Sequence, residues 1–432
     1  MTSRPIDGFR PHPVDWRLKG LPPRADGCMP DELQALDLNL LRGDLMLPVA
    51  VLRESCLRNN RSWMQAFLRS TGVNLCPHGK TSMSPEIFRM QAEDGVWGFT
   101  AATAQHVRVY RHLGIRRVLL ANQLVGRANI EYVLNELAMD PSFDFYCLVD
   151  SLDSVRLLKE VSADQGLRRP VHVLLEIGAV GGRTGVRTFD EGLAVAEAVS
   201  SGGPSLALRG VEAFEGIFQT TPDAVGRATS MLDLLTNLAV RCAERDLFAP
   251  GSIVLSAGGS GLFDLCATAL KATPLAGRAE VVLRSGCYVT HDNGMYETLF
   301  HRLRQRTPAV AALGPGLQPA LEVWAHVQSI PEPGRVIAGL GKRDVSYDVE
   351  MPKLLWWYRA GVHDRPRAAT PDHVVSTLFD QHAYVDGPAG VFAVGDYLGF
   401  GISHPCTTFD KWRMIPIVDD SYRVVSAITT LF

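Results

Sequence analysis

A lysine in a short loop is the first residue whose type and setting could do chemistry. Lys80 lies in the segment Cys76–Thr81 (CPHGKT), directly after a short apolar run. A lysine held away from water has a lowered pKa, and its neutral amine can attack an aldehyde. Few of the 43 basic residues are lysines, so candidates for an amine nucleophile are scarce. The alternative interpretation is a surface lysine in a loop.

Two glycine-rich segments could bind an anion. Ser256–Gly261 (SAGGSG) follows one late apolar run, and Arg284–Tyr288 (RSGCY) follows the next. Glycines let backbone N–H groups converge on an anion, and the N-terminus of a following helix adds positive potential. The two segments therefore predict a phosphate site, with flexible turns as the alternative.

An arginine set among glycines is a third candidate. Arg183 lies within Gly181–Gly185, shortly after an apolar run that ends near Glu176. Such an arginine could reach an oxyanion. The more common alternative is a solvated arginine on a loop.

A histidine and a cysteine two residues apart could bind a metal. If the segment His404-Pro405-Cys406 is extended, both side chains face the same side. Imidazole and thiolate together favour zinc, and two protein ligands leave positions open for water or substrate. The alternative is a buried cysteine beside an unrelated histidine.

The elements that must position these residues alternate in type along the middle of the chain. Eight apolar, strand-like runs are separated by segments of helical character, which is typical of a (β/α)8 barrel. An open doubly wound sheet could use the same elements. The predicted strands are 73–78, 97–103, 117–122, 143–150, 171–177, 209–214, 253–258 and 281–286. The predicted helices are 85–94, 104–113, 129–139, 152–163, 189–200, 224–245 and 263–272.

The two ends of the chain, outside this alternating region, show a different residue pattern. Beyond about residue 295, short strand-like runs lie among glycines and prolines, which predicts a second, mainly β domain. We therefore predict three regions: residues 1–46 joining the β domain, the barrel over 47–295 and the β domain over 296–432. A strand at 47–52 and a helix at 53–70 are expected to lead into the barrel. The β-domain strands are predicted at 323–328, 336–338, 343–349, 391–394 and 423–427.

Composition excludes several classes of protein. The 432 residues are 46% hydrophobic and 21% charged with a net charge of −3, so we expect neither nucleic acid nor anionic lipid as partner. No apolar run is long enough to span a membrane, and no leader segment is apparent. The eight cysteines contain no Cys-x-x-Cys pair, which predicts reduced thiols in a cytoplasmic protein. A serine hydrolase is disfavoured because a G-x-S-x-G motif is lacking.

Taken in order, these motifs resemble those of one enzyme family. Pro77, His78, Lys80 and Thr81 match a Pro-His-x-Lys-Thr signature. Arg284, Gly286 and Tyr288 match Arg-Pro-Gly-x-Tyr, with Ser285 in place of proline, and His404 and Cys406 match a His-x-Cys pair. The chain thus resembles the D-threonine aldolase/D-serine dehydratase family of fold-type III, alanine racemase-like pyridoxal-phosphate enzymes.

The resemblance implies a role for each matched residue. Lys80 would bind pyridoxal 5′-phosphate covalently and act as the catalytic base, and Arg183 would lie near the phenolic oxygen of the cofactor. His404 and Cys406 would hold Zn2+. The remaining residues expected to bind the cofactor are His78, Gly258, Gly259, Ser260, Gly286, Cys287 and Tyr288.

The chain also departs from the family pattern. Many relatives carry a second lysine shortly after the first, where this chain has Met83. Relatives often have a tyrosine after the sixth barrel strand, where this chain has Phe214, so the partner of the pyridine ring is in doubt. Arg284 is an alternative partner.

The activity implied is β-elimination of water from a D-3-hydroxy amino acid such as D-serine or D-threonine, followed by hydrolysis of the product to a 2-oxo acid and ammonia. Aldol cleavage to glycine and an aldehyde is the nearest alternative, and Cys406 in place of an aspartate favours the dehydratase. A racemase is less favoured because it needs no metal pair. A non-catalytic pyridoxal-phosphate carrier is disfavoured by the β domain. By the same resemblance we expect a homodimer.

Overall fold

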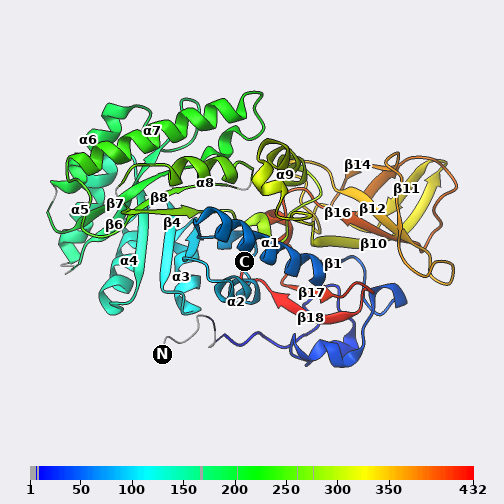
Figure 1. The fold of residues 1–432 in the computed structure, drawn as a ribbon. Coiled ribbons are helices and arrows are strands. Elements are labelled where there is room, and N and C mark those ends of the chain that lie inside the picture. Colours follow the sequence, from blue (N-terminus) through cyan, green and yellow to red (C-terminus); the bar gives the residue numbers. More distant parts are fainter. Residues whose placement is uncertain (1–5, 7–8, 166–168, 202, 260, 276) are drawn as a thin grey trace.

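The chain folds into a barrel and a β domain that lie side by side (Figure 1). The computed structural model describes residue 6 and residues 9–165, 169–201, 203–259, 261–275 and 277–432. Ser260, one of the residues expected at the phosphate, lies outside the described residues. Among those described, no helix is long and apolar enough to cross a membrane.

The barrel is an eight-stranded, wholly parallel sheet that curls back on itself. Its strand order is β2-β9-β8-β7-β6-β5-β4-β3. The two edge strands, β2 and β3, meet through a parallel bridge between His78, just beyond the end of β2, and Thr100 of β3. The predicted (β/α)8 barrel is thereby confirmed. Its strands are β2 Asn74–Leu75, β3 Phe99–Ala101, β4 Arg117–Gln123, β5 Asp144–Val149, β6 Val171–Ile177, β7 Leu206–Ala213, β8 Ile253–Ala257 and β9 Ala279–Leu283.

Helices follow the barrel strands and cover their outer faces (Figure 1). They begin where the sequence offers a cap: the side-chain oxygens of Ser84, Thr103 and Thr188 accept N–H groups of the first turns of α2, α3 and α6. Pro85 stands at the first position of α2, where its missing N–H costs nothing. The helices are α2 Pro85–Glu93, α3 Ala104–His112, α4 Arg127–Met139, α5 Leu152–Gln165, α6 Phe189–Ser200, α7 Ala224–Glu244 and α8 Phe263–Lys271.

The barrel strands are buried on both faces, which explains their continuous apolar runs. In β5, Phe145, Cys147 and Val149 join the large core beneath the helices. The alternate residues Tyr146 and Leu148 join a separate small cluster with Trp97 and residues of β4, β6, β8 and β9. This inner cluster fills the barrel, so a ligand can enter only beyond the strand ends.

The β domain is built on a second, mostly antiparallel sheet. Its central order is β13-β12-β16-β10-β1-β17-β18, and β11, β14 and β15 extend it from β10. Its strands beyond β1 are β10 Leu321–Glu332, β11 Arg335–Ala338, β12 Lys353–Tyr358, β13 Arg367–Ala368, β14 Val374–Leu378, β15 Ala383–Asp386, β16 Tyr397–Gly401, β17 Met414–Val418 and β18 Val424–Thr429.

The strand predicted to lead into the barrel belongs to this second sheet. β1 (Val49–Arg53) pairs antiparallel with β10 and parallel with β17. The helix α1 (Glu54–Thr71) then carries the chain into the barrel. Local sequence predicted both elements but not the partner of the strand, because pairing is decided by segments more than 250 residues away in the chain.

Two strands predicted in the β domain are wrong. Residues 343–349 form turns and bends, in which the N–H groups of Asp344 and Val345 donate to the carbonyl of Gly341. Residues 391–394 end in a turn where the N–H of Ala393 donates to Asp396. In both segments a local turn takes backbone donors that a strand would need for its ladder.

The N-terminal segment lies against the β domain (Figure 1). Val14, Leu21, Leu33 and Leu40 are buried in one cluster with Trp324 and other residues of the second sheet. Three short helices, α9 Met295–Arg306, α10 Pro308–Ala311 and α11 Cys406–Phe409, complete the molecule. α9 and α11 both lie close to the ends of the barrel strands, where the cavity described next is formed (Figure 1).

Candidate active site

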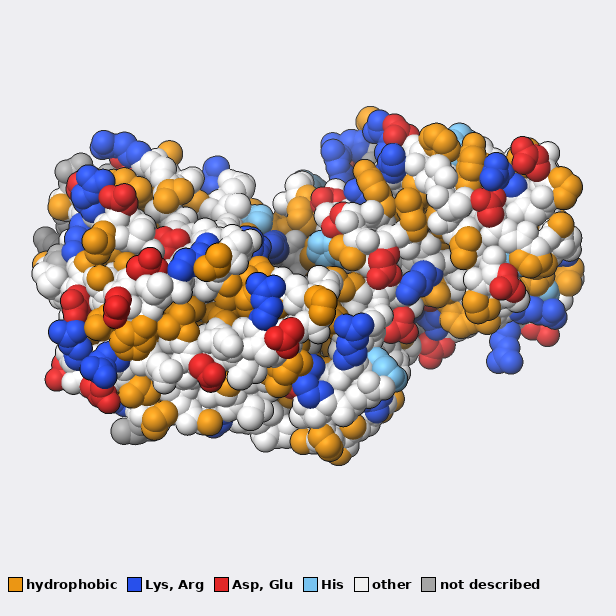
Figure 2. Space-filling model, turned by 90° about the horizontal axis from the view of Figure 1, so that it is seen from above, with side chains coloured by type: hydrophobic (Ala, Val, Ile, Leu, Met, Phe, Trp, Pro, Cys, Tyr) orange, Lys and Arg blue, Asp and Glu red, His pale blue; other side chains and the backbone are white. Residues whose placement is uncertain are grey.

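A cavity of about 400 Å³ lies at the carboxyl ends of the barrel strands. Residues that follow β2, β3, β6, β7, β8 and β9 line it, and His404 and Cys406 close it from the β domain. Figure 2 shows the surface hollowed between the two parts, with histidine and basic side chains on its walls. This volume is within the range of about 300–1,000 Å³ that ligand pockets occupy.

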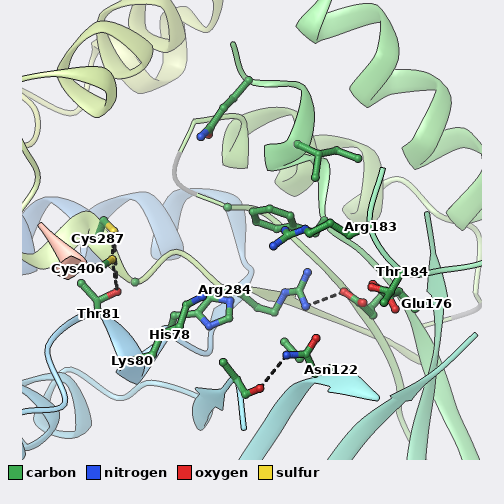
Figure 3. A pocket seen from close by; sticks show the side chains of 18 of the residues that line it. His78, Lys80, Thr81, Asn122, Glu176, Arg183, Thr184, Arg284, Cys287 and Cys406 are labelled. Carbon is green, nitrogen blue, oxygen red and sulfur yellow. Dashed lines mark hydrogen bonds and ion pairs between the residues drawn. The ribbon is translucent and has the colours of Figure 1, made fainter. Parts of the chain in front are cut away.

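Lys80 points into this cavity from the short helix Gly79–Thr81 (Figure 3). Its amine makes no hydrogen bond or ion pair with any residue that the structure describes. A Cβ on Gly79 would lie 2.3 Å from the hydroxyl oxygen of Tyr110 and 2.8 Å from the Phe88 ring. Glycine is therefore required there, since it lets the loop seat on α2 and α3 and aims Lys80 at the cavity.

His78 lies beside Lys80 on the same wall (Figure 3). Burial, together with the nearby positive charges of Lys80 and Arg284, lowers the pKa of His78 well below its usual value. Its Nδ1 has no hydrogen-bond partner in the described part of the chain. A neutral imidazole with a free nitrogen therefore faces the cavity.

A buried ion pair lies at the carboxyl ends of the barrel strands. Arg284 Nη1 lies 2.6 Å from the carboxylate oxygen Oε2 of Glu212, and its Nη2 donates to the carbonyl of Ala213. Burial raises the pKa of Glu212 to about 8, against the lowering effect of Arg284. Arg284 was a candidate partner for the pyridine ring, whereas Glu212 was missed, although a carboxylate at a barrel strand end is a recognisable signal.

A second carboxylate, Glu176, ends β6 on the cavity wall. It accepts a hydrogen bond of 2.7 Å from the hydroxyl of Thr184 and another from the side-chain amide of Gln123. Burial raises its pKa, and these two hydrogen bonds oppose the effect. Arg183 lies on the same side, with its guanidinium 4.5 Å from the centre of the Phe214 ring (Figure 3). Phe214 therefore packs against a cation where relatives often have a tyrosine.

Two backbone N–H groups of the first predicted phosphate loop already donate hydrogen bonds to a carboxylate. The N–H groups of Gly258 and Gly259 donate to Glu215, at 2.9 and 2.7 Å. Glu215 is fully buried and was missed by sequence reasoning. The sequence feature that could have indicated Glu215 is its position directly after Phe214, at the end of a barrel strand. Phosphate binding through these two amides would require Glu215 to release them.

The second predicted phosphate loop is divided between the cavity and the core. Gly286 and Cys287 line the cavity. A Cβ on Gly286 would lie 2.7 Å from the carbonyl oxygen of His78, so only glycine fits. The side chain of Tyr288 does not line the cavity: it is buried in the large hydrophobic core, where burial raises its pKa.

His404 and Cys406 lie at the cavity, although the segment is not extended as expected. His404 has a left-handed backbone with φ of 59°, and Cys406 begins α11. The N–H of His404 donates to Asp292 at 2.9 Å, and its Nδ1 lies 2.6 Å from Oδ2 of Asp348. These two aspartates, both missed from sequence, hold the strained residue in place.

The histidine and the cysteine also affect each other. The hydrogen bond to Cys406, and the nearby carboxylate of Asp348, raise the pKa of His404 to about 9. The contacts of Cys406 with Cys287 and His404 lower the pKa of the Cys406 thiol. Among the residues described, no three histidine, cysteine or acidic side chains are arranged around one point as a metal site.

The donor set nevertheless fits the groups expected from sequence. A lysine without a partner, a neutral histidine and the space above Gly286 suit a pyridoxal cofactor. A thiol of lowered pKa and an imidazole whose second nitrogen is fixed by a carboxylate suit a transition metal. The roles assigned to individual residues stay predictions.

Comparison with known proteins identifies two domains in the chain. Residues 53–247 match the N-terminal domain of alanine racemase, and residues 320–418 match the putative serine dehydratase domain. D-threo-3-hydroxyaspartate dehydratase from Delftia sp. strain HT23 is 28% identical over 249 residues, which are 57% of this chain. That match spans 61% of the length of the dehydratase.

Solved structures show the same fold at low identity. D-threonine aldolase from Filomicrobium marinum covers 91% of this chain, and 97% of its own length is matched, with a TM-score of 0.74 and 22% identity. The Delftia dehydratase also covers 91% of this chain, with 99% of its own length matched, a TM-score of 0.69 and 21% identity. Two further structures are variants of a D-threo-3-hydroxyaspartate dehydratase. One variant replaces a histidine, and the other replaces a cysteine two positions later. The cysteine variant is in a metal-free form.

Proposed function

We propose that this chain, which belongs to the alanine racemase-like barrels that carry a serine dehydratase domain, is a pyridoxal-phosphate-dependent lyase of D-3-hydroxy amino acids. The observation that carries the proposal is one cavity that holds both Lys80, which has no partner among the described residues, and the pair His404 and Cys406. A base for the α-proton and a metal-binding pair for the β-hydroxyl are the two groups that such a reaction needs.

Within this proposal, the residues of the barrel bind the cofactor. Lys80 would hold its aldehyde carbon, and Gly286 leaves the space for it. When bound, pyridoxal phosphate supplies an electron sink for the pair of electrons left at the α-carbon. The neutral imidazole of His78 and the ion pair of Arg284 with Glu212 would set the polarity of the surrounding wall.

The amine of Lys80 would move the proton. It has no carboxylate partner among the described residues, so it is free to leave the cofactor and take the proton from the α-carbon. Removal of the α-proton and departure of the β-hydroxyl release water. Hydrolysis of the product then gives ammonia and a 2-oxo acid, so the net change is loss of ammonia.

The pair from the β domain would act on the hydroxyl. His404 and Cys406 would hold a metal cation, which supplies Lewis acidity toward a β-hydroxyl. Asp348 would keep the proton on Nδ1 of His404, so that Nε2 would give up its proton to bind the metal. The thiol of Cys406 favours zinc over magnesium.

The second candidate activity is aldol cleavage to glycine and an aldehyde. It would use the same lysine and the same metal pair, and the fold is shared with a D-threonine aldolase. We favour the dehydratase because Cys406 is the second residue of the metal pair. The sequence relative that supports this choice is a dehydratase.

One product assay separates these activities. Protein supplied with pyridoxal phosphate and Zn2+ is incubated with D-threonine, D-serine or D-threo-3-hydroxyaspartate. We expect a 2-oxo acid and ammonia in equal amounts, lost on chelation of the metal and absent with the L-enantiomers. Glycine and an aldehyde would instead establish the aldolase. Failure to convert any of the three substrates by either route would contradict the proposal.

A further inference from the structure

Two thiols from different parts of the molecule meet at the cavity. The sulfur atoms of Cys287 and Cys406 lie 3.6 Å apart (Figure 3). Cys287 follows β9 of the barrel at the start of the short helix Cys287–Val289, and Cys406 begins α11 in the β domain. Both are free thiols, and they are 119 residues apart in the sequence.

The spacing of the two sulfur atoms is that of a shared metal ion. A thiolate lies about 2.3 Å from zinc, so two thiolates on one tetrahedral zinc lie about 3.8 Å apart. The observed 3.6 Å is close to this value. The Thr81 hydroxyl, 3.9 Å from Cys287 and 3.7 Å from Cys406, is one polar neighbour that both sulfurs share.

The third donor at this place is an imidazole. His404 is hydrogen-bonded through Nδ1 to Asp348, which leaves Nε2 as its metal-binding nitrogen. The three side chains do not surround one point in the described structure. The thiol pair is already at metal spacing, however, and the imidazole of His404 is held beside Cys406.

We propose that Cys287 is a second thiolate ligand, which completes a metal site of two thiolates and one imidazole with Cys406 and His404. This inference rests on the proposed function and specifies its metal centre. Each thiol gives up its proton to solvent as the metal binds. Two thiolates and an imidazole favour zinc over magnesium or manganese. They leave the fourth position of a tetrahedral ion open for a substrate oxygen.

The site would also join the two parts of the molecule. Cys287 comes from the barrel, whereas Cys406 and His404 come from the β domain. A ligand set drawn from both sides makes the metal a crosslink over the cavity. A pair of ligands from the β domain alone would not have this effect.

X-ray absorption at the zinc edge tests the proposal on the unaltered protein. We expect two sulfur ligands at about 2.3 Å and at least one nitrogen ligand. A fit with one sulfur, or failure of the protein to bind zinc after reconstitution, would overturn the proposal. A disulfide between Cys287 and Cys406 that persists in the zinc-loaded protein under reducing conditions would overturn it as well.

Cobalt substitution tests the residues one at a time. Co2+ bound to thiolates absorbs in the near ultraviolet by charge transfer from sulfur, with an intensity that follows the number of thiolates. Cys287→Ala and Cys406→Ala should each lose about half of this absorbance. Cys242→Ala, which alters a buried thiol of α7 away from the cavity, should keep all of it. An unchanged spectrum in Cys287→Ala would overturn the proposal.

Metal binding and turnover are read separately in these experiments. Two sulfur ligands in a protein without lyase activity would support the ligand set and contradict the proposed function. Lyase activity with a single sulfur ligand would support the proposed function and contradict the ligand set. If Cys287→Ala does not fold, the absorption spectrum of the unaltered protein still decides the number of sulfur ligands.

Discussion

The side chain of His404 is fixed by Asp348, whose carboxylate oxygen Oδ2 lies 2.6 Å from Nδ1 of the imidazole. A carboxylate can only accept, so Nδ1 carries a proton, and Nε2 is the nitrogen that can give up its proton to bind a metal. The other oxygen of Asp348 accepts the hydroxyl of Thr407 at 3.1 Å, which holds the carboxylate in turn. Asp348 therefore positions the imidazole that we propose as a metal ligand, and would do so without touching the metal.

Replacement of this aspartate tests that role. Asp348→Asn should weaken zinc binding roughly 10- to 100-fold, because the amide holds the imidazole less firmly and makes its free nitrogen less basic. The affinity is measured by competition with a chromophoric chelator. Asp364→Asn, which alters an exposed aspartate of the β domain, should leave the affinity unchanged. Equal affinities in the two variants would contradict the role given to Asp348.

The lysine of the cavity should be the residue that binds the cofactor. Lys80→Ala should lose the visible absorbance of covalently bound pyridoxal phosphate, and turnover should fall at least 10²-fold, since both the anchor and the base are removed. Borohydride reduction of the unaltered protein should label the peptide that contains Lys80, as measured by mass spectrometry. Lys353→Ala, at an exposed lysine of β12, is the matched control. A label on another lysine would disprove the assignment.

Glu215 should be essential to the loop after β8. Glu215→Ala removes the acceptor of two buried N–H groups, those of Gly258 and Gly259, at a cost of roughly 1–3 kcal/mol for each. The free energy of unfolding in urea should fall accordingly. Glu350→Ala removes an exposed carboxylate that lies 3.7 Å from Lys353 and should cost well under about 1 kcal/mol. A loss in Glu215→Ala no larger than in this control would refute the role of Glu215.

His291 should make stability depend on pH. It is 4% exposed, and burial lowers its pKa to about 4 from a usual value of 6.5. Between these values the unfolded chain binds a proton that the folded chain does not. Stability should therefore fall as the pH drops from 6.5 to about 4, by up to about 1.4 kcal/mol per pH unit.

Asparagine at this position isolates the effect. His291 has φ of 50°, a left-handed conformation that asparagine tolerates. His291→Asn should therefore fold and should lose stability less steeply than the unaltered protein between pH 6.5 and 4. Parallel urea-denaturation curves at several pH values give the two slopes. Identical slopes would mean that His291 is protonated as easily in the folded protein as in the unfolded one.

Much of the barrel could be predicted because its signals are local. A run such as 171–177 is mainly apolar because a parallel barrel strand is buried on both faces. The cap and proline at Ser84 and Pro85 start α2 where they were expected to. Local patterns failed at residues 343–349, where the N–H groups of Asp344 and Val345 donate to the carbonyl of Gly341 and form turns.

The candidate site was predicted only in part, for the same physical reason. The motif around Lys80 and the pair His404 and Cys406 are short and contiguous, and the structure brings them to one cavity. Glu212, Glu215 and Asp348 carry no motif of their own. Their importance comes from partners such as Arg284 and Gly258, which lie far away in the chain.

By itself, the sequence determined the elements of this protein and the chemical types it has available: parallel strands, capped helices, a lysine at a strand end and a histidine–cysteine pair. These follow from the burial pattern and backbone preferences of consecutive residues. Only the tertiary structure decided which side chains meet. It placed β1 in the second sheet, gave the amides of Gly258 and Gly259 to Glu215, and brought Cys287 within 3.6 Å of Cys406. Such contacts join segments that are distant in the chain, so no local pattern records them.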